Sequence, residues 1–99
     1  MSYKHVYTPA ALKDYSESVS WYALRSTRAA ENFIIEVKEK IRGICNNPAK
    51  FKSRYKNFRE TSLKKYPFCI IYFTDEANKT VVITAVYHNK RNPRGKYRQ

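Results

Sequence analysis

The chain has 99 residues and a formal net charge of +12, with 42% hydrophobic and 15% aromatic residues. This length suits a single domain covering residues 1–99, and the apolar fraction argues against disorder throughout. The sequence contains no stretch apolar enough to span a bilayer or to act as a secretory signal, so we expect a cytoplasmic protein that does not bind membranes.

The positive charge is concentrated in two segments. Residues 9–48 are nearly neutral, whereas residues 49–66 contain seven lysine and arginine residues against the single acid Glu60. Residues 87–99 add five cations and no acid, so these two segments carry 11 of the 12 net charges. A surface that joins them would suit a phosphate backbone or an acidic protein partner. The alternative is a scattered basic surface that only keeps the protein soluble.

The first predicted elements are a strand and a helix. Aromatic residues alternate along residues 3–7, which predicts a short strand. Thr8 then caps a helix that starts with Pro9 and runs to about Leu24. Trp21 lies off the apolar face of this helix, where it either packs on a neighbouring element or marks an exposed contact. The predicted apolar face consists of Leu12, Tyr15, Val19 and Tyr22.

A second helix follows after a tight turn. Ser26 or Thr27 caps it, and residues 46–48 end it with two asparagines and a proline. Its continuous apolar stripe is formed by Ala30, Phe33, Ile34, Val37, Ile41, Ile44 and Cys45. Because each of the two helices has one apolar face, we expect an antiparallel hairpin that covers one face of a sheet.

The remaining predicted elements are strands. Residues 58–66 form a weak polar strand, while residues 67–75 and 80–88 are apolar enough to be central strands. Asn78 is the expected left-handed residue of the turn between the last two strands. The predicted class is α+β with the order β-α-α-β-β-β, in which a helical hairpin packs on one face of a mostly antiparallel sheet.

This order has a consequence for the two basic segments. The loop at residues 50–56 and the tail after His88 are expected to border one groove on the sheet face that the helices leave uncovered. Exposed tyrosines would offer stacking surfaces there if the partner were RNA.

Several kinds of site find no support in the sequence. Cys45 and Cys69 have no metal-binding spacing, and we expect both to be reduced, buried and small hydrophobic residues. Gly43 and Gly95 are the only glycines, too few for a phosphate-binding glycine loop. Paired carboxylates for glycosidase chemistry are missing as well. The sequence therefore calls for no metal and no cofactor.

What remains is a basic set suited to chemistry on a phosphodiester, with Arg59, His88, Arg91 and Tyr97 as candidate catalysts. Arginine stabilises charge on the phosphorane oxygens, while histidine or tyrosine moves the proton of the attacking 2′-hydroxyl or the leaving oxygen. A histidine and a tyrosine at a strand end more often serve packing or hydrogen bonding, which is the alternative interpretation. The candidate RNA-binding residues are Lys50, Lys52, Arg54, Lys56, Lys90 and Arg94.

Nearly the whole chain resembles a known family. The run "WY" with "AENFIIEVKEKIRGICNNP", then "FRETSLKKYPFCIIYFTDE" and "VVITAVYHNKRNP", is similar to the RelE/ParE superfamily of toxins from bacterial type II toxin–antitoxin pairs. The resemblance implies the same β-α-α-β-β-β order. It also implies one of two activities, because RelE-like members cleave messenger RNA in the ribosomal A site and ParE-like members inhibit DNA gyrase. Both kinds are neutralised by an antitoxin.

The residues match the nuclease branch in part. Arg91 and Tyr97 correspond to the working arginine and tyrosine of the RelE-like tail, and the lysines of residues 50–56 to the basic loop. Cys69 stands where RelE-like nucleases have an arginine, and Arg59 is the candidate to replace it in space. His88 resembles the histidine of an "H..R.P" subgroup that is often grouped with ParE-like proteins.

These observations predict a toxin that inhibits growth by ribosome-associated, metal-independent cleavage of messenger RNA. A ParE-like inhibitor of DNA gyrase that breaks no bond is the first alternative, and a non-toxic basic RNA-binding domain of the same fold is the second. The expected partners are an acidic antitoxin, which complements the basic chain, and either the ribosome with its message or DNA gyrase as the target.

Overall fold

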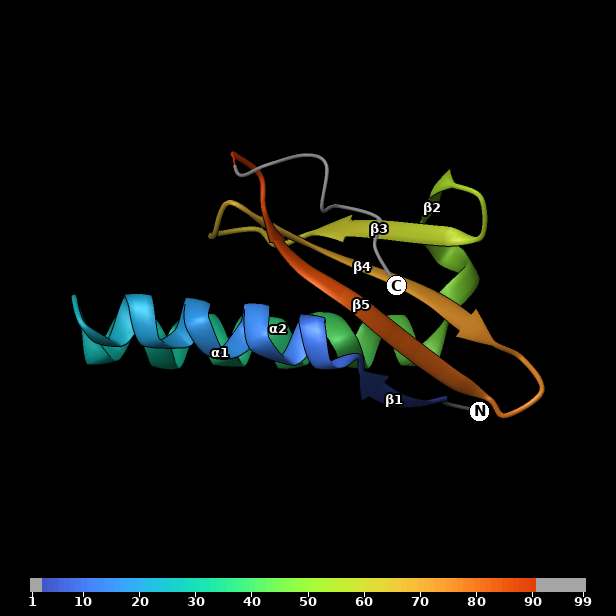
Figure 1. Cartoon of the computed structure of the whole chain (residues 1–99), viewed down its shortest axis with the longest axis horizontal. Helices are drawn as coiled ribbons and strands as arrows, with labels where there is room; N and C mark the ends of the chain where they lie inside the picture. Colours follow the sequence, from blue (N-terminus) through green and yellow to red (C-terminus); the bar gives the residue numbers. More distant parts are fainter. Residues whose placement is uncertain (1–2, 91–99) are drawn as a thin grey trace.

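The computed structural model describes residues 3–90, in which two long helices pack on one face of a sheet (Figure 1). The helices are α1 (Pro9–Ala23) and α2 (Thr27–Asn46), and a short 3-10 helix, η1, covers Pro48–Lys50. The strands are β1 (Lys4–Tyr7), β2 (Lys52–Tyr55), β3 (Phe58–Ser62), β4 (Phe68–Asp75) and β5 (Thr80–His88). The predicted α+β class, with a helical hairpin on a mostly antiparallel sheet, is confirmed.

The described residues form a five-stranded sheet in the order β1-β5-β4-β3-β2. β1 runs parallel to β5, and the other neighbours are antiparallel. β2 was expected to be part of a loop, because its sequence KSRY shows no apolar alternation. It pairs with β3 at the edge of the sheet, where Lys52 lies opposite Glu60 and Ser53 opposite Arg59. Polar and charged residues are common in edge strands, and they hide such strands from a search for hydrophobic patterns.

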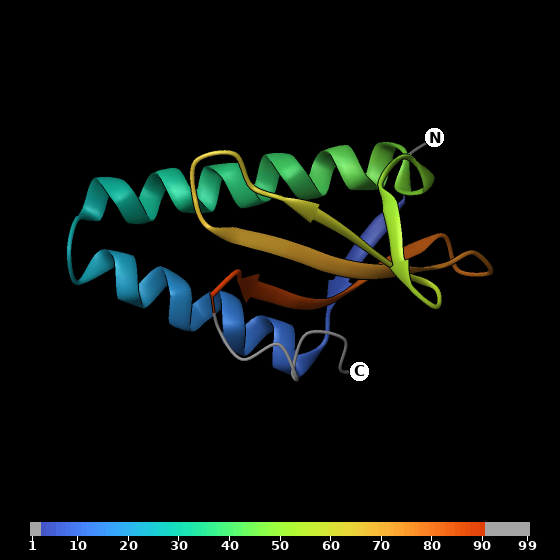
Figure 2. The same ribbon diagram turned by 90° about the horizontal axis from the view of Figure 1, so that it is seen from above.

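Both helices begin at a predicted capping residue. The Thr8 hydroxyl accepts a hydrogen bond from the backbone N–H of Ala11 at 3.1 Å, and Ser26 accepts one from Ala29 at the same distance. Figure 2 shows the two helices side by side along the sheet. Neither of these helices, the long ones in residues 3–90, is long and apolar enough to cross a lipid bilayer.

The buried face of α1 differs from the prediction at two positions. Leu12 is 53% exposed, whereas Ala11 and Ser18 are buried against the sheet. The Ser18 hydroxyl donates a hydrogen bond to the carbonyl oxygen of Asp14 at 2.8 Å, so its burial leaves the donor satisfied. Small residues at these positions allow α1 to approach the sheet closely. Tyr15, Val19 and Tyr22 pack partly buried against the core, as predicted.

Between the helices and the sheet lies a core organised around Phe33. The predicted stripe of α2 supplies this side of the core, although Ile34 is half-buried. The Phe33 ring lies 5.1 Å from Phe68, 5.2 Å from Tyr22 and 5.3 Å from Tyr66, measured between ring centroids. Aromatic pairs at these distances add to the free energy gained from burial alone.

The opposite face of the sheet carries a second buried apolar cluster. It consists of Phe58, Cys69, Ile71, Ala85 and Tyr87. Both cysteines are free and buried, Cys69 in this cluster and Cys45 in the core beneath the helices, as predicted. Burial also raises the pKa of the Cys45 thiol, which keeps it protonated and unreactive.

A β-bulge in β5 shifts the alternation of the strand by one residue, so the residues after the bulge lie on the opposite face of the sheet from the one that strict alternation would give. Ile71 pairs with Ala85 and Tyr72 pairs with Ile83, which leaves Thr84 as the extra residue. The Thr84 hydroxyl donates a hydrogen bond to the Ile71 carbonyl oxygen at 3.2 Å. Residues 81 and 83 lie in the helix-side core before the bulge, and residue 86 lies in that core after it. The odd-numbered residues that follow the bulge therefore point to the opposite face.

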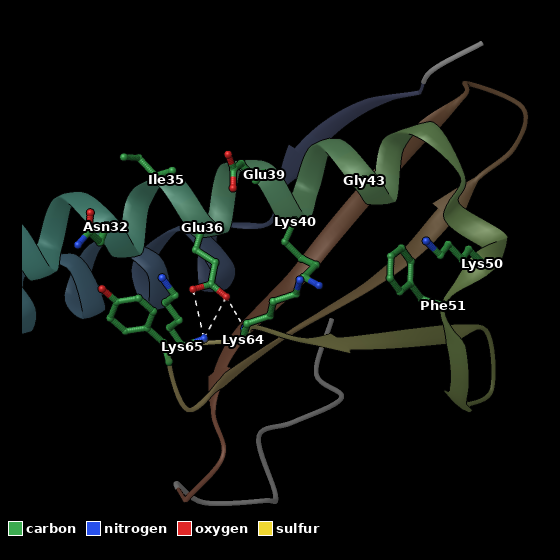
Figure 3. A pocket seen from close by; sticks show the side chains of 11 residues that line it. Asn32, Ile35, Glu36, Glu39, Lys40, Gly43, Lys50, Phe51, Lys64 and Lys65 are labelled. Atoms are coloured by element: carbon green, nitrogen blue, oxygen red, sulfur yellow. Dashed lines mark hydrogen bonds between the residues drawn. The ribbon is translucent and has the colours of Figure 1, made fainter.

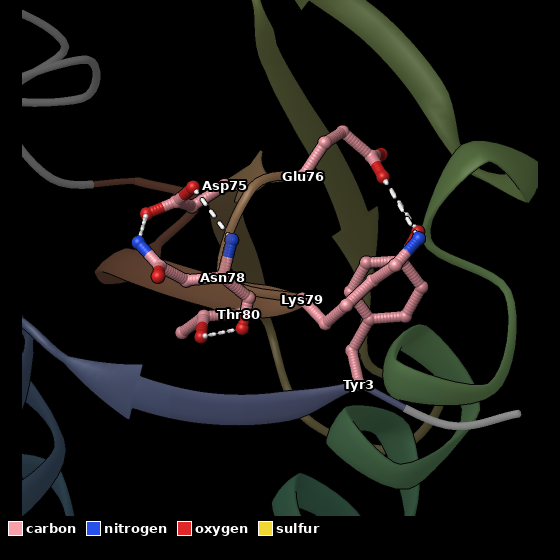
Figure 4. A network of polar contacts seen from close by, with 6 residues as sticks. All are labelled: Tyr3, Asp75, Glu76, Asn78, Lys79 and Thr80. Carbon is pink, nitrogen blue, oxygen red and sulfur yellow. Dashed lines mark hydrogen bonds and ion pairs between the residues drawn. The ribbon is translucent and has the colours of Figure 1, made fainter.

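The turn between β4 and β5 corrects one prediction (Figure 4). The left-handed residue is Lys79, with φ 49°, and not Asn78. Asn78 instead donates hydrogen bonds to the Asp75 carboxylate from its backbone N–H at 3.2 Å and from its side-chain amide at 2.8 Å. These bonds lower the pKa of Asp75. The Tyr3 hydroxyl donates to Glu76 at 2.7 Å and connects this turn to the start of β1.

Candidate functional site

Arg59 lies on the helix side of the sheet, where its side chain donates hydrogen bonds to backbone carbonyl oxygens. It pairs with Tyr72 across β3 and β4, and paired residues share a face. Its guanidinium donates a hydrogen bond to the Phe51 carbonyl oxygen at 2.6 Å, and the Ala49 carbonyl oxygen lies at 3.4 Å. The buried Tyr72 hydroxyl donates to the Pro48 carbonyl oxygen at 2.5 Å. Together these side chains tie η1 and the approach to β2 to the sheet.

Tyr72 is not a candidate for proton transfer near neutral pH. Burial raises the pKa of its phenol to about 12, although the neighbouring Arg59 lowers it in part. The hydroxyl therefore stays protonated and remains a hydrogen-bond donor to η1.

His88 also lies on the helix side, as a result of the bulge at Thr84. It pairs with Phe68, and the two rings meet edge to face with their centroids 5.0 Å apart. The Nδ1 atom of His88 accepts a hydrogen bond from the backbone N–H of Lys90 at 3.1 Å. An Nδ1 atom that accepts a hydrogen bond carries no proton itself.

Arg59 and His88 lie too far apart to act on one phosphate. Their partners on β4, Tyr72 and Phe68, are four positions apart, which spans about 13 Å along a strand, and β4 itself separates the two residues. Cys69 lies on the opposite face of the sheet from both. The hypothesis that Arg59 replaces the strand arginine at Cys69 does not fit this geometry.

Three predicted site residues, Arg91, Arg94 and Tyr97, lie outside the described residues, as does the side chain of Arg54. Among the others, Lys50, Lys52 and Lys56 follow η1 and β2 at one edge of the sheet. Lys90 follows β5 and lies beside α1. Strands β3 and β4 lie between these two places. The rest of the tail that the expected groove would use lies outside the described residues, so the groove stays a prediction.

Two smaller groupings of predicted residues do occur, one of them formed by His88 and Lys90, which line a cavity of about 190 Å³ beside α1. Lys56 and Arg59 line one cavity of about 250 Å³ together with Ser53 and Glu76. Glu76 places a carboxylate in this cavity, which opposes the binding of a phosphate there.

A cavity of about 640 Å³ lies between α2 and the turn that joins β3 to β4 (Figure 3). Glu36 of α2 accepts hydrogen bonds from the backbone N–H groups of Lys64 and Lys65 and so fixes this turn. The ammonium groups of Lys40 and Lys50 lie 5.9 and 5.6 Å from the centroid of the Phe51 ring. Four lysines and two carboxylates, those of Glu36 and Glu39, thus border a partly apolar cavity. The excess of two positive charges suits an anionic and partly apolar partner.

Sequence reasoning assigned Lys50 to a binding surface but missed the other lysines of this cavity. Lys64 and Lys65 belong to the basic segment found in the sequence, so their charge was a usable signal. Lys40 was not recognisable, because it lies on α2 and joins the cavity only through the packing of η1 and Phe51 beside that helix.

An Arg59→Met variant is expected to lose about 1.5–3 kcal/mol of the free energy of unfolding, because the carbonyl of Phe51 loses a charged donor. Arg59→Lys should lose less, since an ammonium still reaches one carbonyl. Arg28→Met, an exposed arginine on α2, is the matched control and should change stability by less than about 0.5 kcal/mol. Urea unfolding measures all three. An Arg59→Met protein of unchanged stability would contradict the structural role.

Comparisons with known proteins agree with this fold. The family model described as the ParE toxin of the type II toxin–antitoxin system parDE matches residues 6–93. A chain from the chromosomal ParDE system of P. aeruginosa superposes with a TM-score of 0.73 at 15% identity, covering 88% of this chain and 96% of that one.

Two structures from E. coli are similar as well. A chain of the intact RelBE toxin–antitoxin complex gives a TM-score of 0.65 at 17% identity, covering 91% of this chain and 100% of that one. The isolated RelE toxin gives 0.64 at 16% identity, covering 96% and 93%. No curated protein matches the sequence significantly. Because the family model spans nearly the whole sequence, the chain belongs to the ParE toxin family of type II toxin–antitoxin systems.

Proposed function

We propose that this toxin inhibits growth by binding DNA gyrase and that it breaks no bond itself. The observation that carries the proposal is the position of the candidate catalysts that residues 3–90 contain. Arg59 and His88 lie on the helix side and far from each other, while Cys69 and its apolar neighbours occupy the face where a RelE-like nuclease would have its arginine. The match to the ParE family model supports the same choice.

We further propose an acidic antitoxin as the partner that neutralises the toxin. Similar chains from P. aeruginosa and E. coli come from ParDE and RelBE toxin–antitoxin systems. The net charge of +12 and the cavity bordered by Lys40, Lys50, Lys64 and Lys65 support an acidic partner. Complementary charge of this kind steers association and selects the partner.

Cleavage of messenger RNA on the ribosome is the second candidate function. Its support is the basic tail, which holds Arg91 and Tyr97 at positions that match the RelE-like pattern. In this mechanism the arginine would stabilise the scissile phosphate and the tyrosine or His88 would transfer a proton, without a metal ion.

A variant that combines His88→Gln, Arg91→Lys and Tyr97→Phe is expected to arrest growth as strongly as the unmodified toxin. The three changes remove the groups that transfer protons and the bidentate guanidinium, yet they preserve charge and approximate shape for binding. Induced expression without antitoxin, at protein levels matched by immunoblot, measures the arrest.

Arg91→Glu is the matched control for this variant. It reverses the charge of the basic tail and should weaken the arrest if the tail contacts the target. Loss of arrest in the triple variant would instead favour the nuclease. If expression of the unmodified chain does not slow growth, both toxin mechanisms are contradicted and the chain is a non-toxic domain of the same fold.

A further inference from the structure

A cavity of about 500 Å³ lies between β1, the middle of α1 and the second half of α2. Its volume is within the range of roughly 300–1,000 Å³ that is typical of small-molecule cavities. It shares no lining residue with the cavity bordered by Lys40, Lys50, Lys64 and Lys65. The proposed binding of DNA gyrase assigns no role to this cavity, so an inference about it goes beyond that function.

Aromatic side chains form much of the lining. Tyr3, His5 and Tyr7 are spaced two residues apart along the first strand and therefore share one face of it. The ring of Tyr7 stacks with that of Tyr15 from α1, with centroids 5.8 Å apart and planes inclined by 13°. The ring of His5 meets Tyr7 edge to face at the same centroid distance. A flat ring can pack against such a lining by stacking or by edge-to-face contacts.

The other weakly acidic groups of the lining are neutral near pH 7. Burial raises the pKa of the Tyr7 phenol to about 12, and it raises the pKa values of the Tyr15 phenol and the Cys45 thiol as well. Protonated phenols are hydrogen-bond donors that add no negative charge. These groups therefore do not oppose the binding of an anion.

The charge of the lining is positive. Among the described residues, the lining contains Lys38 and Arg42 and no carboxylate, and these two exposed cations lie one turn apart on one face of α2. Glu39, which follows Lys38 in the sequence, lines the other cavity. Glu76 accepts the hydrogen bond of Tyr3 at 2.7 Å, but it also pairs with a lysine of its own turn at 3.8 Å (Figure 4). The lining as a whole thus favours an anionic ligand.

An acidic segment of a partner protein is the alternative occupant. One side chain of such a segment offers either an apolar group or a carboxylate. The lining instead combines aromatic rings and two cations around a single cavity of small-molecule size. A ligand that carries a ring and a carboxylate on one molecule matches both parts of the lining at once.

We propose that this cavity binds a small aromatic carboxylate. The ring of the ligand packs against Tyr7 and Tyr15, and its carboxylate lies near the ammonium of Lys38 and the guanidinium of Arg42. The bound ligand contacts β1, α1 and α2 together, so it stabilises the folded toxin as its concentration rises.

Two-dimensional NMR of the backbone amides, with naphthoate as the probe ligand and the whole chain as the protein, tests the proposal. Saturable shifts are expected at Tyr7 and Ile41, which line the cavity, while the indole signal of Trp21, which does not, stays in place. Naphthylmethanol has the ring without the charge, and acetate has the charge without the ring. Each should bind at least about 5-fold more weakly than naphthoate.

A matched pair of double variants separates this site from general attraction to a basic chain. Lys38→Gln combined with Arg42→Gln should weaken the binding of naphthoate about 5- to 30-fold, the range for loss of two exposed charge contacts. Lys13→Gln combined with Arg28→Gln removes two exposed cations that do not line the cavity, and it should leave the affinity unchanged. All four side chains are exposed, and the amide spectrum of each variant verifies that it is folded.

Three results would overturn the proposal. Equal affinities for naphthoate and naphthylmethanol would mean that the cations play no part. Equal losses in the two double variants would mean that only the net charge of the chain attracts the ligand. If Tyr7 and Ile41 show no saturable shift, the cavity does not bind aromatic carboxylates, and an acidic segment of a partner protein becomes the better occupant.

None of these outcomes depends on whether the toxin inhibits gyrase.

Discussion

A Phe33→Ala variant is expected to lose about 3–5 kcal/mol of its free energy of unfolding. Phe33 is 0% exposed at the centre of the core between the helices and the sheet. Removing its ring takes away contacts with aromatic side chains from α1, from β4 and from the turn before β4. Since a domain of this size is stable by only about 5–15 kcal/mol, this loss is a large part of the total free energy of unfolding.

Urea unfolding followed by circular dichroism measures this loss. Ile35→Ala is the matched control, because Ile35 lies on the same helix two residues away and is 53% exposed. Its effect should stay below about 1 kcal/mol. Similar losses in the two variants would mean that Phe33 is not the centre of the core.

The helical half of the fold was predictable because its signals are local. Thr8 and Ser26 are caps, and the spacing of residues along α2 assigns its buried face without knowledge of the sheet. The central strands β4 and β5 were recognisable by their continuous apolar residues. In each case one short stretch of sequence contains the physical cause of the structure.

Features that depend on long-range packing were not predictable. α1 buries the small Ala11 against the core and leaves Leu12 exposed, and this orientation of the helix depends on the sheet that it packs on. β2 is recognisable only through its pairing with β3, since its own residues are polar. Lys79 adopts the left-handed conformation, while Asn78 is engaged with Asp75.

To predict the candidate site correctly, one must know which face of the sheet each strand residue occupies. Strict alternation from Ile83 would have placed His88 on the same face as Cys69, but the extra residue at Thr84 moves His88 to the helix side. Arg59 follows Phe58 on β3 and therefore points away from the face of Cys69. A bulge has no reliable sequence signature, so this part of the site could not be derived from the residues alone.

The proposal that the toxin binds DNA gyrase predicts a large biochemical effect. A tightly bound inhibitor in stoichiometric excess should suppress the supercoiling of relaxed plasmid by purified gyrase almost completely. The triple variant His88→Gln, Arg91→Lys, Tyr97→Phe should suppress it equally, because no proton transfer by the toxin is involved. Unmodified toxin that has been denatured by heat, at the same concentration, controls for nonspecific binding of a basic chain to DNA.

The most direct test places the same toxin preparation in two assays. One measures supercoiling by gyrase, and the other maps message ends by primer extension on programmed ribosomes to which the toxin is bound. We expect supercoiling to be lost and no new message ends to form. Unaffected supercoiling together with new message ends would contradict the proposal and identify the chain as a ribosome-associated nuclease.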